Sequence, residues 1–311
     1  MSKDRMLALD NLPVELLYEI YTLALSPSLP LISKHLHAVF KAAPPTLHAQ
    51  YLIRCYEEFA EHSASARAFG LVSKVLRYPI CTREVLEAIL RSPECPRIPG
   101  PEDPDRRPTV LPRHLFRNLT PRDSTGQRPW MEFDAPLPFL RFLYTDPRIP
   151  FPATNSYDGY ALTRAVYAGF TPLVRFLLAH DASPECKGNL AVTVAIRRKS
   201  LPLVRMLIER DGPTGEASSS VSRKRRRSGS TGNGDESGAA SGEGSGGGSS
   251  SSEKTSPKRS GSKRRKLGDR VSVTPEMLKA AVKCDARDIA EYLMREKGCV
   301  PDMQTVLMMG R

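Results

Sequence analysis

Few residues of this 311-residue chain have the types and spacing that catalysis or metal binding requires. His35 and His37 would point to different sides of a helix, so they could not share a metal ion. Glu57 and Glu58 fall in an amphipathic helical pattern, where a solvated face explains them better than acid–base catalysis. The common phosphate-binding, nucleophile-elbow and zinc-protease motifs are absent. We therefore expect no catalytic site, no metal, no cofactor and no enzyme activity.

The clearest chemistry lies in a segment of Gly, Ser and clustered Lys and Arg, residues 213–270. It holds 13 Lys/Arg and 6 Asp/Glu, and so carries +7 of the net charge of +12. With almost no large aliphatic side chains it cannot offset the entropy of ordering, and we expect it to be disordered. The rest of the chain carries only +5, which argues against a protein that coats nucleic acid.

Two basic tetrapeptides in this segment are of the kind that nuclear-import receptors bind in extended form. We predict that they direct the protein to the nucleus, and leave open a share in the cytoplasm. Contact with nucleic-acid phosphates and a purely solubilising role are the alternatives. No aromatic residue stands between the basic ones to stack on bases, which argues against nucleic acid. The predicted import residues are Lys224, Arg225, Arg226, Arg227, Lys263, Arg264, Arg265 and Lys266.

Two serines beside these clusters are candidate phosphorylation sites. Ser228 follows R-R-R and resembles a basophilic kinase site, and Ser256 precedes Pro257 and resembles a proline-directed site. A phosphate would add about −1.5 to −2 charge next to the cluster. We expect this charge to weaken nuclear import.

Outside the basic segment, apolar residues recur three and four apart, which predicts an all-α chain. No run of about 18 apolar residues occurs, so we expect no transmembrane helix and no membrane partner. The N-terminus has no long apolar core of a secretory signal. The six scattered cysteines, with no C-x-x-C pair, indicate a reduced intracellular protein.

A stretch from Pro93 to Pro138 has 11 prolines in 46 residues, which excludes long helices and central strands. Its large apolar side chains are candidates for pinning it to the fold. They are Leu111, Leu115, Phe116, Leu119, Trp130 and Phe133.

The helical segments repeat. Residues 160–185 align with residues 190–214 at a constant offset of 30, and residues 276–302 form a third copy 86 residues further on. Removing about 56 residues of the basic segment restores an offset of about 30 between the second and third copies. The basic segment is therefore predicted to be an insertion within a repeat array. The aligned pairs include Ala165 and Ala195, Val166 and Ile196, Leu173 and Leu203, and Leu177 and Leu207.

This unit resembles the ankyrin repeat, whose period is about 33 residues. The resemblance rests on the turn Asp158-Gly159, on Gly169 between two helices, and on the second-helix pattern L-V-x-F-L-L from Leu173. It implies stacked helix pairs that bind a target protein on their concave surface and turn tips. On that surface the sequence carries Tyr157, Tyr160, Arg164, Tyr167, Arg197 and Arg198.

The N-terminal residues 9–40 resemble the F-box, whose signature is L-P-x-E-L-L-x-x-I followed by a "V-S-K" helix. The resemblance implies that the segment binds a Skp-family adaptor, which links it to a cullin ubiquitin ligase. The alternative is that these helices only cap the repeat array. The matching residues are Leu12, Pro13, Glu15, Leu16, Leu17 and Ile20, which the resemblance implies to face the adaptor, followed by Ile32, Ser33 and Lys34.

Together these patterns predict F-box-like N-terminal helices followed by an ankyrin-type helical solenoid with a long disordered insertion. The function expected from the two resemblances is substrate recognition for a Skp, cullin and F-box type ubiquitin ligase, with a protein scaffold as the alternative. The expected divisions are an adaptor-binding motif (1–45), a helical region (46–138) with a proline-rich part (93–138), repeats (139–212), the insertion (213–270) and a C-terminal repeat (271–311).

Overall fold

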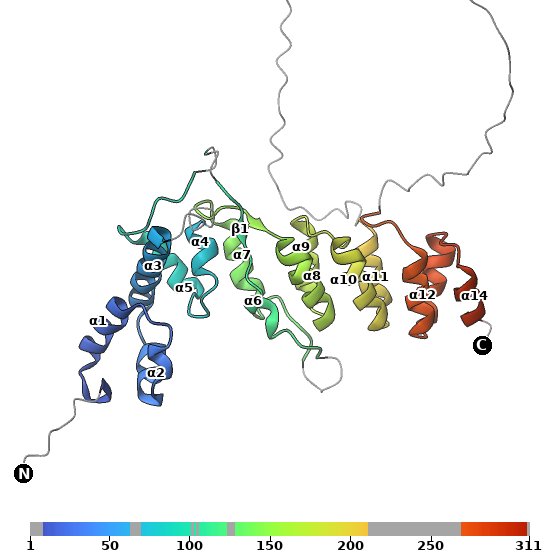
Figure 1. Ribbon diagram of the computed structural model, residues 1–311. Coiled ribbons are helices and arrows are strands. Elements are labelled where there is room, and N and C mark those ends of the chain that lie inside the picture. The colour runs from blue at the N-terminus through green and yellow to red at the C-terminus, as the bar shows by residue number, and fades with distance from the viewer. Residues whose placement is uncertain are drawn as a thin grey trace, which may run out of the picture. The chain divides into compact units, whose positions relative to one another are not determined.

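The computed structural model describes residues 9–62, 70–100, 103, 106–122, 128–210 and 269–309. Within these residues the chain is mostly helical, as the spacing of apolar residues predicts (Figure 1). Apart from Asp269 and Arg270, the predicted insertion lies outside the described residues, so its disorder stays a prediction.

The N-terminal helices pack on one another through α3. Helix α1 packs on α3, and α3 also packs on α4 and α5. Two helices start at the hydroxyl caps their sequences suggest: Ser33 Oγ accepts a hydrogen bond from the Leu36 N–H, and Thr82 Oγ1 accepts one from the Val85 N–H. In chain order the elements are η1 (Leu9–Asn11), α1 (Val14–Ala24), η2 (Leu29–Leu31), α2 (Lys34–Lys41), α3 (Pro45–His62), α4 (Leu71–Val75) and α5 (Arg83–Arg91), where η marks a short 3-10 helix.

The proline-rich stretch contains only short elements, because proline removes the N–H donors that longer ones need. Strand β1 (Thr109–Val110) pairs in parallel with β2 (Pro152–Ala153), a small departure from an all-α chain. A single helical turn, α6 (His114–Arg117), follows β1 and packs on the repeat helices.

Most of the predicted anchor residues do hold this stretch to the core. Leu111, Phe116 and Leu119 are buried, and the Trp130 ring stacks on Phe170 with 4.7 Å between ring centroids. Phe133 is the exception, because its side chain is 69% exposed.

Most of the remaining helices form pairs. A left-handed residue ends the first helix of each of three pairs: Gly169, Lys199 and Asp285. One residue later, an N–H donates to a carbonyl five residues back, as in a Schellman motif, so the three turns share one hydrogen-bond pattern. The elements are α7 (Leu137–Thr145), α8 (Ser156–Ala168), α9 (Thr171–Ala179), α10 (Cys186–Arg197), α11 (Leu201–Ile208), α12 (Pro275–Lys283), α13 (Arg287–Glu291), the π-helical turn η4 (Tyr292–Glu296) and α14 (Met303–Met309).

These pairs repeat at the offsets that the sequence predicts. The turn residues lie 30 and 86 positions apart. The apolar pairs aligned between the first two copies are buried, while in the third copy Val282, at the position of Val166, is half-buried. Helix α8 packs on α10, and α10 packs on α12, so each first helix lies beside the next (Figure 1).

The residues that flank the basic segment lie side by side. Glu209 and Asp269 form an antiparallel β-bridge, and the Arg270 N–H donates to the Ile208 carbonyl. The Arg270 side chain also donates to the carbonyls of Leu178 and Glu209. The chain therefore returns next to the point where it left, and the C-terminal helices follow directly on α11.

Candidate functional site

The outward face of the N-terminal helices carries large apolar side chains in water. Leu16 is 45% exposed, Leu23 72%, Leu31 77% and Ile32 63%. We call these four residues the N-terminal apolar surface. Leu16 and Leu23 are seven residues apart on α1 and so lie on one face of that helix. Exposed apolar side chains that share one face, as Leu16 and Leu23 do, are typical of a site for another protein.

The opposite face of α1 belongs to the core. Leu17 is fully buried, and the Tyr21 ring stacks on Phe40 and on Tyr51, with 4.5 and 4.1 Å between centroids. Burial raises the pKa of Tyr21 to about 12, and the nearby Cys55 adds to the effect. The phenol therefore stays neutral, and these rings fasten α1 to α2 and α3.

The six residues predicted to face an adaptor divide between these two faces. Pro13, Glu15 and Leu16 are exposed, and Leu12 and Ile20 are half-buried. Leu17 corrects the expectation: it follows Leu16 by one residue and is turned inward, because neighbours on a helix point about 100° apart. Leu23 and Leu31 were missing from the set of residues predicted to face the adaptor. The sequence could have indicated them, because Leu23 is an apolar residue of a short helix and Leu31 an apolar residue of a proline-rich turn.

A second surface lies on α8, on α10 and at the start of α6. We call it the arginine–tyrosine surface. Its residues are exposed except for Tyr160, which is half-buried, and they are Arg113, Arg117, Tyr157, Tyr160, Tyr167, Lys187 and Arg197. The Arg113 guanidinium carbon lies 4.7 Å from the Tyr157 ring centroid and 5.5 Å from that of Tyr160. Tyr160 and Tyr167 share one face of α8 at a spacing of seven residues.

Two further arginines of the predicted concave surface have a structural role instead. Arg164 donates to the carbonyls of Arg117 and Leu119 at 2.7 and 2.6 Å, and so holds the end of α6 against α8. Arg198 donates to the Tyr167 carbonyl at the end of α8. Desolvation lowers the pKa of Arg198, which is nevertheless far too high for the group to lose its charge near neutral pH.

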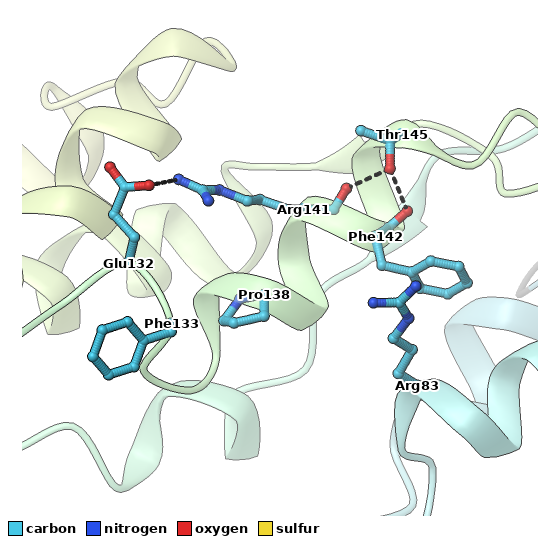
Figure 2. A pocket seen from close by; sticks show the side chains of 7 residues that line it. All are labelled: Arg83, Glu132, Phe133, Pro138, Arg141, Phe142 and Thr145. Atoms are coloured by element: carbon cyan, nitrogen blue, oxygen red, sulfur yellow. Dashed lines mark hydrogen bonds and ion pairs between the residues drawn. The ribbon is translucent and has the colours of Figure 1, made fainter.

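A shallow pocket of about 450 Å³ lies beside α5 and α7 (Figure 2). Glu132 and Arg141 form an ion pair across it at 2.7 Å, and Arg83 lies over the Phe142 ring while pairing with Glu87. Thr145 Oγ1 donates to backbone carbonyls. Both cations and the hydroxyl are thus engaged, and the pocket offers no activated nucleophile or acid–base pair. Its lining residues are Arg83, Glu132, Phe133, Pro138, Arg141, Phe142 and Thr145.

Other features bear on the remaining predictions. In the described parts of the chain, no group of three or more His, Cys, Asp or Glu is placed to hold a metal ion. Among the same residues, no helix is both long enough and apolar enough to span a bilayer. The predicted import residues at 224–227 and 263–266, and the candidate phosphorylation sites Ser228 and Ser256, lie outside the described residues.

Comparison with protein-family models, with curated proteins and with solved structures gives no match.

Proposed function

We propose that this protein recruits a target protein to a Skp, cullin and F-box type ubiquitin ligase. Its N-terminal helices bind the adaptor, its helical repeats bind the target, and catalysis belongs to the partner enzyme. The main support is the N-terminal apolar surface, which is exposed in a segment whose sequence resembles the F-box. Burying a fully exposed apolar side chain contributes roughly 1.5–3 kcal/mol, and the contribution is smaller for Leu16, which is already partly buried.

In this proposal the helix pairs are repeats of the ankyrin type. Three pairs have the same turn and mostly the same buried positions, and each first helix packs on the next. Such units depend on their neighbours to cover their apolar faces, and they offer an extended surface to a partner. The ankyrin assignment itself rests on the sequence resemblance.

The alternative function is a protein-interaction scaffold whose N-terminus only caps the array. Its support is the inward face of α1, where Leu17 and Tyr21 pack on the helices that follow. The two functions differ in what happens to the N-terminal apolar surface. An adaptor would cover it, whereas it would stay exposed to water if the N-terminal helices only cap the array.

The deciding experiment is capture of a Skp-family adaptor by the full chain. Leu23→Asp should abolish capture, because it places a charge in the apolar contact. Leu307→Asp on α14 is the matched control, since Leu23 and Leu307 are both 72% exposed. Leu17 is unsuitable as a test because a charge at a fully buried position would unfold the helices. If the wild-type chain captures no adaptor, the scaffold function replaces the ligase function.

The proposed site of action is the nucleus, through the two basic tetrapeptides and an import receptor. Changing residues 224–227 and 263–266 to glutamine should abolish nuclear accumulation in localisation imaging while leaving adaptor capture intact. Ser256→Asp should reduce accumulation if a phosphate there opposes import. A deletion of the segment should stop at residue 268, because Asp269 and Arg270 are bonded to the fold. Unchanged localisation in the glutamine variant would refute the nuclear signal.

A further inference from the structure

The arginine–tyrosine surface combines exposed cations, which have no carboxylate partner among the described residues, with the exposed Tyr157 and Tyr167 and the half-buried Tyr160. Among the described residues, no ion pair involves Arg113, Arg117, Lys187 or Arg197. By contrast, carboxylates pair with several arginines elsewhere, namely Arg83, Arg122, Arg128, Arg141, Arg148 and Arg205. Arginine and tyrosine are the side chains that carry the most binding energy in protein interfaces.

Arg113 is held in a geometry that suits a carboxylate. Its guanidinium lies near the rings of Tyr157 and Tyr160, and this contact uses the aromatic faces and none of its N–H donors. No described residue accepts a hydrogen bond from those donors, and their geometry suits the two-pronged hydrogen bonding that a carboxylate accepts. The contact with the rings also restricts the side chain before binding, which lowers the entropy cost of complex formation.

Arg164 and Arg198 fix the frame on which these groups stand. Arg164 ties α6 to α8, and Arg198 of the next pair bonds to the last turn of α8. Helices α6 and α10 both pack on α8. The cations that they carry are therefore held next to the tyrosines of α8. We regard these two arginines as positioning residues.

The surface has the length of a short extended segment. The right-handed part of α8, from Tyr160 to Ala168, is about 13 Å long at about 1.5 Å per residue. An extended chain covers that length with about four residues at roughly 3.3 Å each. Acidic side chains some four residues apart would then meet cations near both ends of α8.

From these features we propose that the arginine–tyrosine surface binds an extended acidic segment, rich in Asp and Glu, of the target protein. This inference rests on the proposed function, because it names the chemical class of the target. Nucleic acid fits less well. Nucleic-acid affinity depends largely on the number of phosphates that Lys and Arg neutralise, and this surface presents only four such cations. The Arg113 and Arg164 guanidiniums also lie over the tyrosine rings on which bases would stack.

The test measures the binding of a fluorescent oligoglutamate peptide by anisotropy. The protein is the full chain with residues 224–227 and 263–266 changed to glutamine, so that the basic segment does not compete. Arg113→Gln combined with Arg197→Gln should weaken binding about tenfold or more, since two charge-assisted contacts are lost. Arg175→Gln on α9, another exposed arginine without a recorded partner in the described chain, is the matched control and should bind as the parent does.

Two results would overturn the inference. The first is equal affinity of the double variant and its parent, or an equal loss in Arg175→Gln. The second is tighter binding of oligothymidylate than of the peptide with the same loss in the double variant, which would assign the surface to nucleic acid. Adaptor capture by the double variant separates this test from the ligase proposal: capture should persist whether or not the acidic peptide binds.

Discussion

The helix pairs α8–α9 and α10–α11 have the same backbone conformation but different exposed residues. Each begins with three consecutive left-handed residues, at 157–159 and 187–189, and each buries the same aligned positions. On the exposed side, Tyr157 and Tyr167 of the first pair correspond to Lys187 and Arg197 of the second. The repeat thus constrains the core and the turns, while the exposed positions of the first helix vary and supply the residues of the interaction surface.

The two pairs also differ in how their first turns meet the next pair. Asn155 joins the first pair to the second, because its amide donates to the Asp181 carbonyl and accepts from the Ser183 N–H. A Cβ at Gly159 would lie 2.8 Å from the Cys186 Cβ, whereas a Cβ at Gly188 would meet no atom within 4 Å. A turn of the same conformation is therefore tightly packed in one pair and open in the other.

Alanine substitutions at these two glycines should give the largest difference in stability between the two helix pairs. Gly159→Ala combines a left-handed φ of +71° with the contact to Cys186, and should lower the free energy of unfolding by about 2–4 kcal/mol. Gly188→Ala meets no close atom and is strained only by the left-handed φ of +63°, so it should lower the free energy of unfolding by about 1–2 kcal/mol. Urea unfolding followed by circular dichroism measures both values.

Each glycine variant is the control for the other, because both introduce the same methyl group at a left-handed position. Equal losses of stability would mean that the Gly159 contact relaxes without cost. A larger loss at Gly188 would contradict the difference in packing.

Substitutions of Arg164 and Arg197 should give a smaller difference in the free energy of unfolding. Arg164→Gln should lower the free energy of unfolding by about 1–3 kcal/mol, because the exposed Arg117 carbonyl and the Leu119 carbonyl, whose hydrogen bond is partly buried, both lose a charged donor. Arg197→Gln should change it by less than about 0.5 kcal/mol, since the side chain is exposed and has no recorded partner among the described residues. A large loss in Arg197→Gln would show that this arginine stabilises the fold, and would remove it from the proposed binding surface.

Much of the repeat architecture could be predicted from the sequence. The 30-residue offset depends on buried apolar residues and on turns, which local sequence largely determines. The left-handed residues at Lys199 and Asp285 could not be predicted in the same way, because neither is glycine and a positive φ is uncommon for other residue types.

The interaction surfaces were less predictable. Leu16 and Leu17 are adjacent leucines of the same motif, and only the packing of Tyr21 against Phe40 and Tyr51 decides which one faces inward. Arg113 was missed because its contact with Tyr157 joins positions 44 residues apart in the sequence. Conversely, Arg164 was predicted to be a contact residue, although it donates to backbone carbonyls of α6.

The smallest expected difference between the two pairs is in how their stability depends on pH. Glu209 ends the second pair where the first has Ala179, and it accepts hydrogen bonds from Tyr292 at 2.8 Å and Lys297 at 3.1 Å. Desolvation raises the pKa of Glu209, but these two bonds outweigh it and hold the pKa below the ordinary 4.5. The resulting stabilisation is present above pH 4.5 and is lost as the pH falls through the lower, folded-state value.

Glu209→Gln should therefore reduce the loss of stability between neutral pH and a pH below 4.5, measured as the shift of the urea midpoint. The difference should be about 0.5 kcal/mol or less, because a side chain that is 36% exposed is screened by solvent. Glu276→Gln, which removes a carboxylate at the exposed start of α12, is the matched control for the substitution itself. An unchanged pH response in Glu209→Gln would mean that the carboxylate is not bonded to Tyr292 and Lys297 in solution, and that the junction after α11 is no more acid-sensitive than the one after α9.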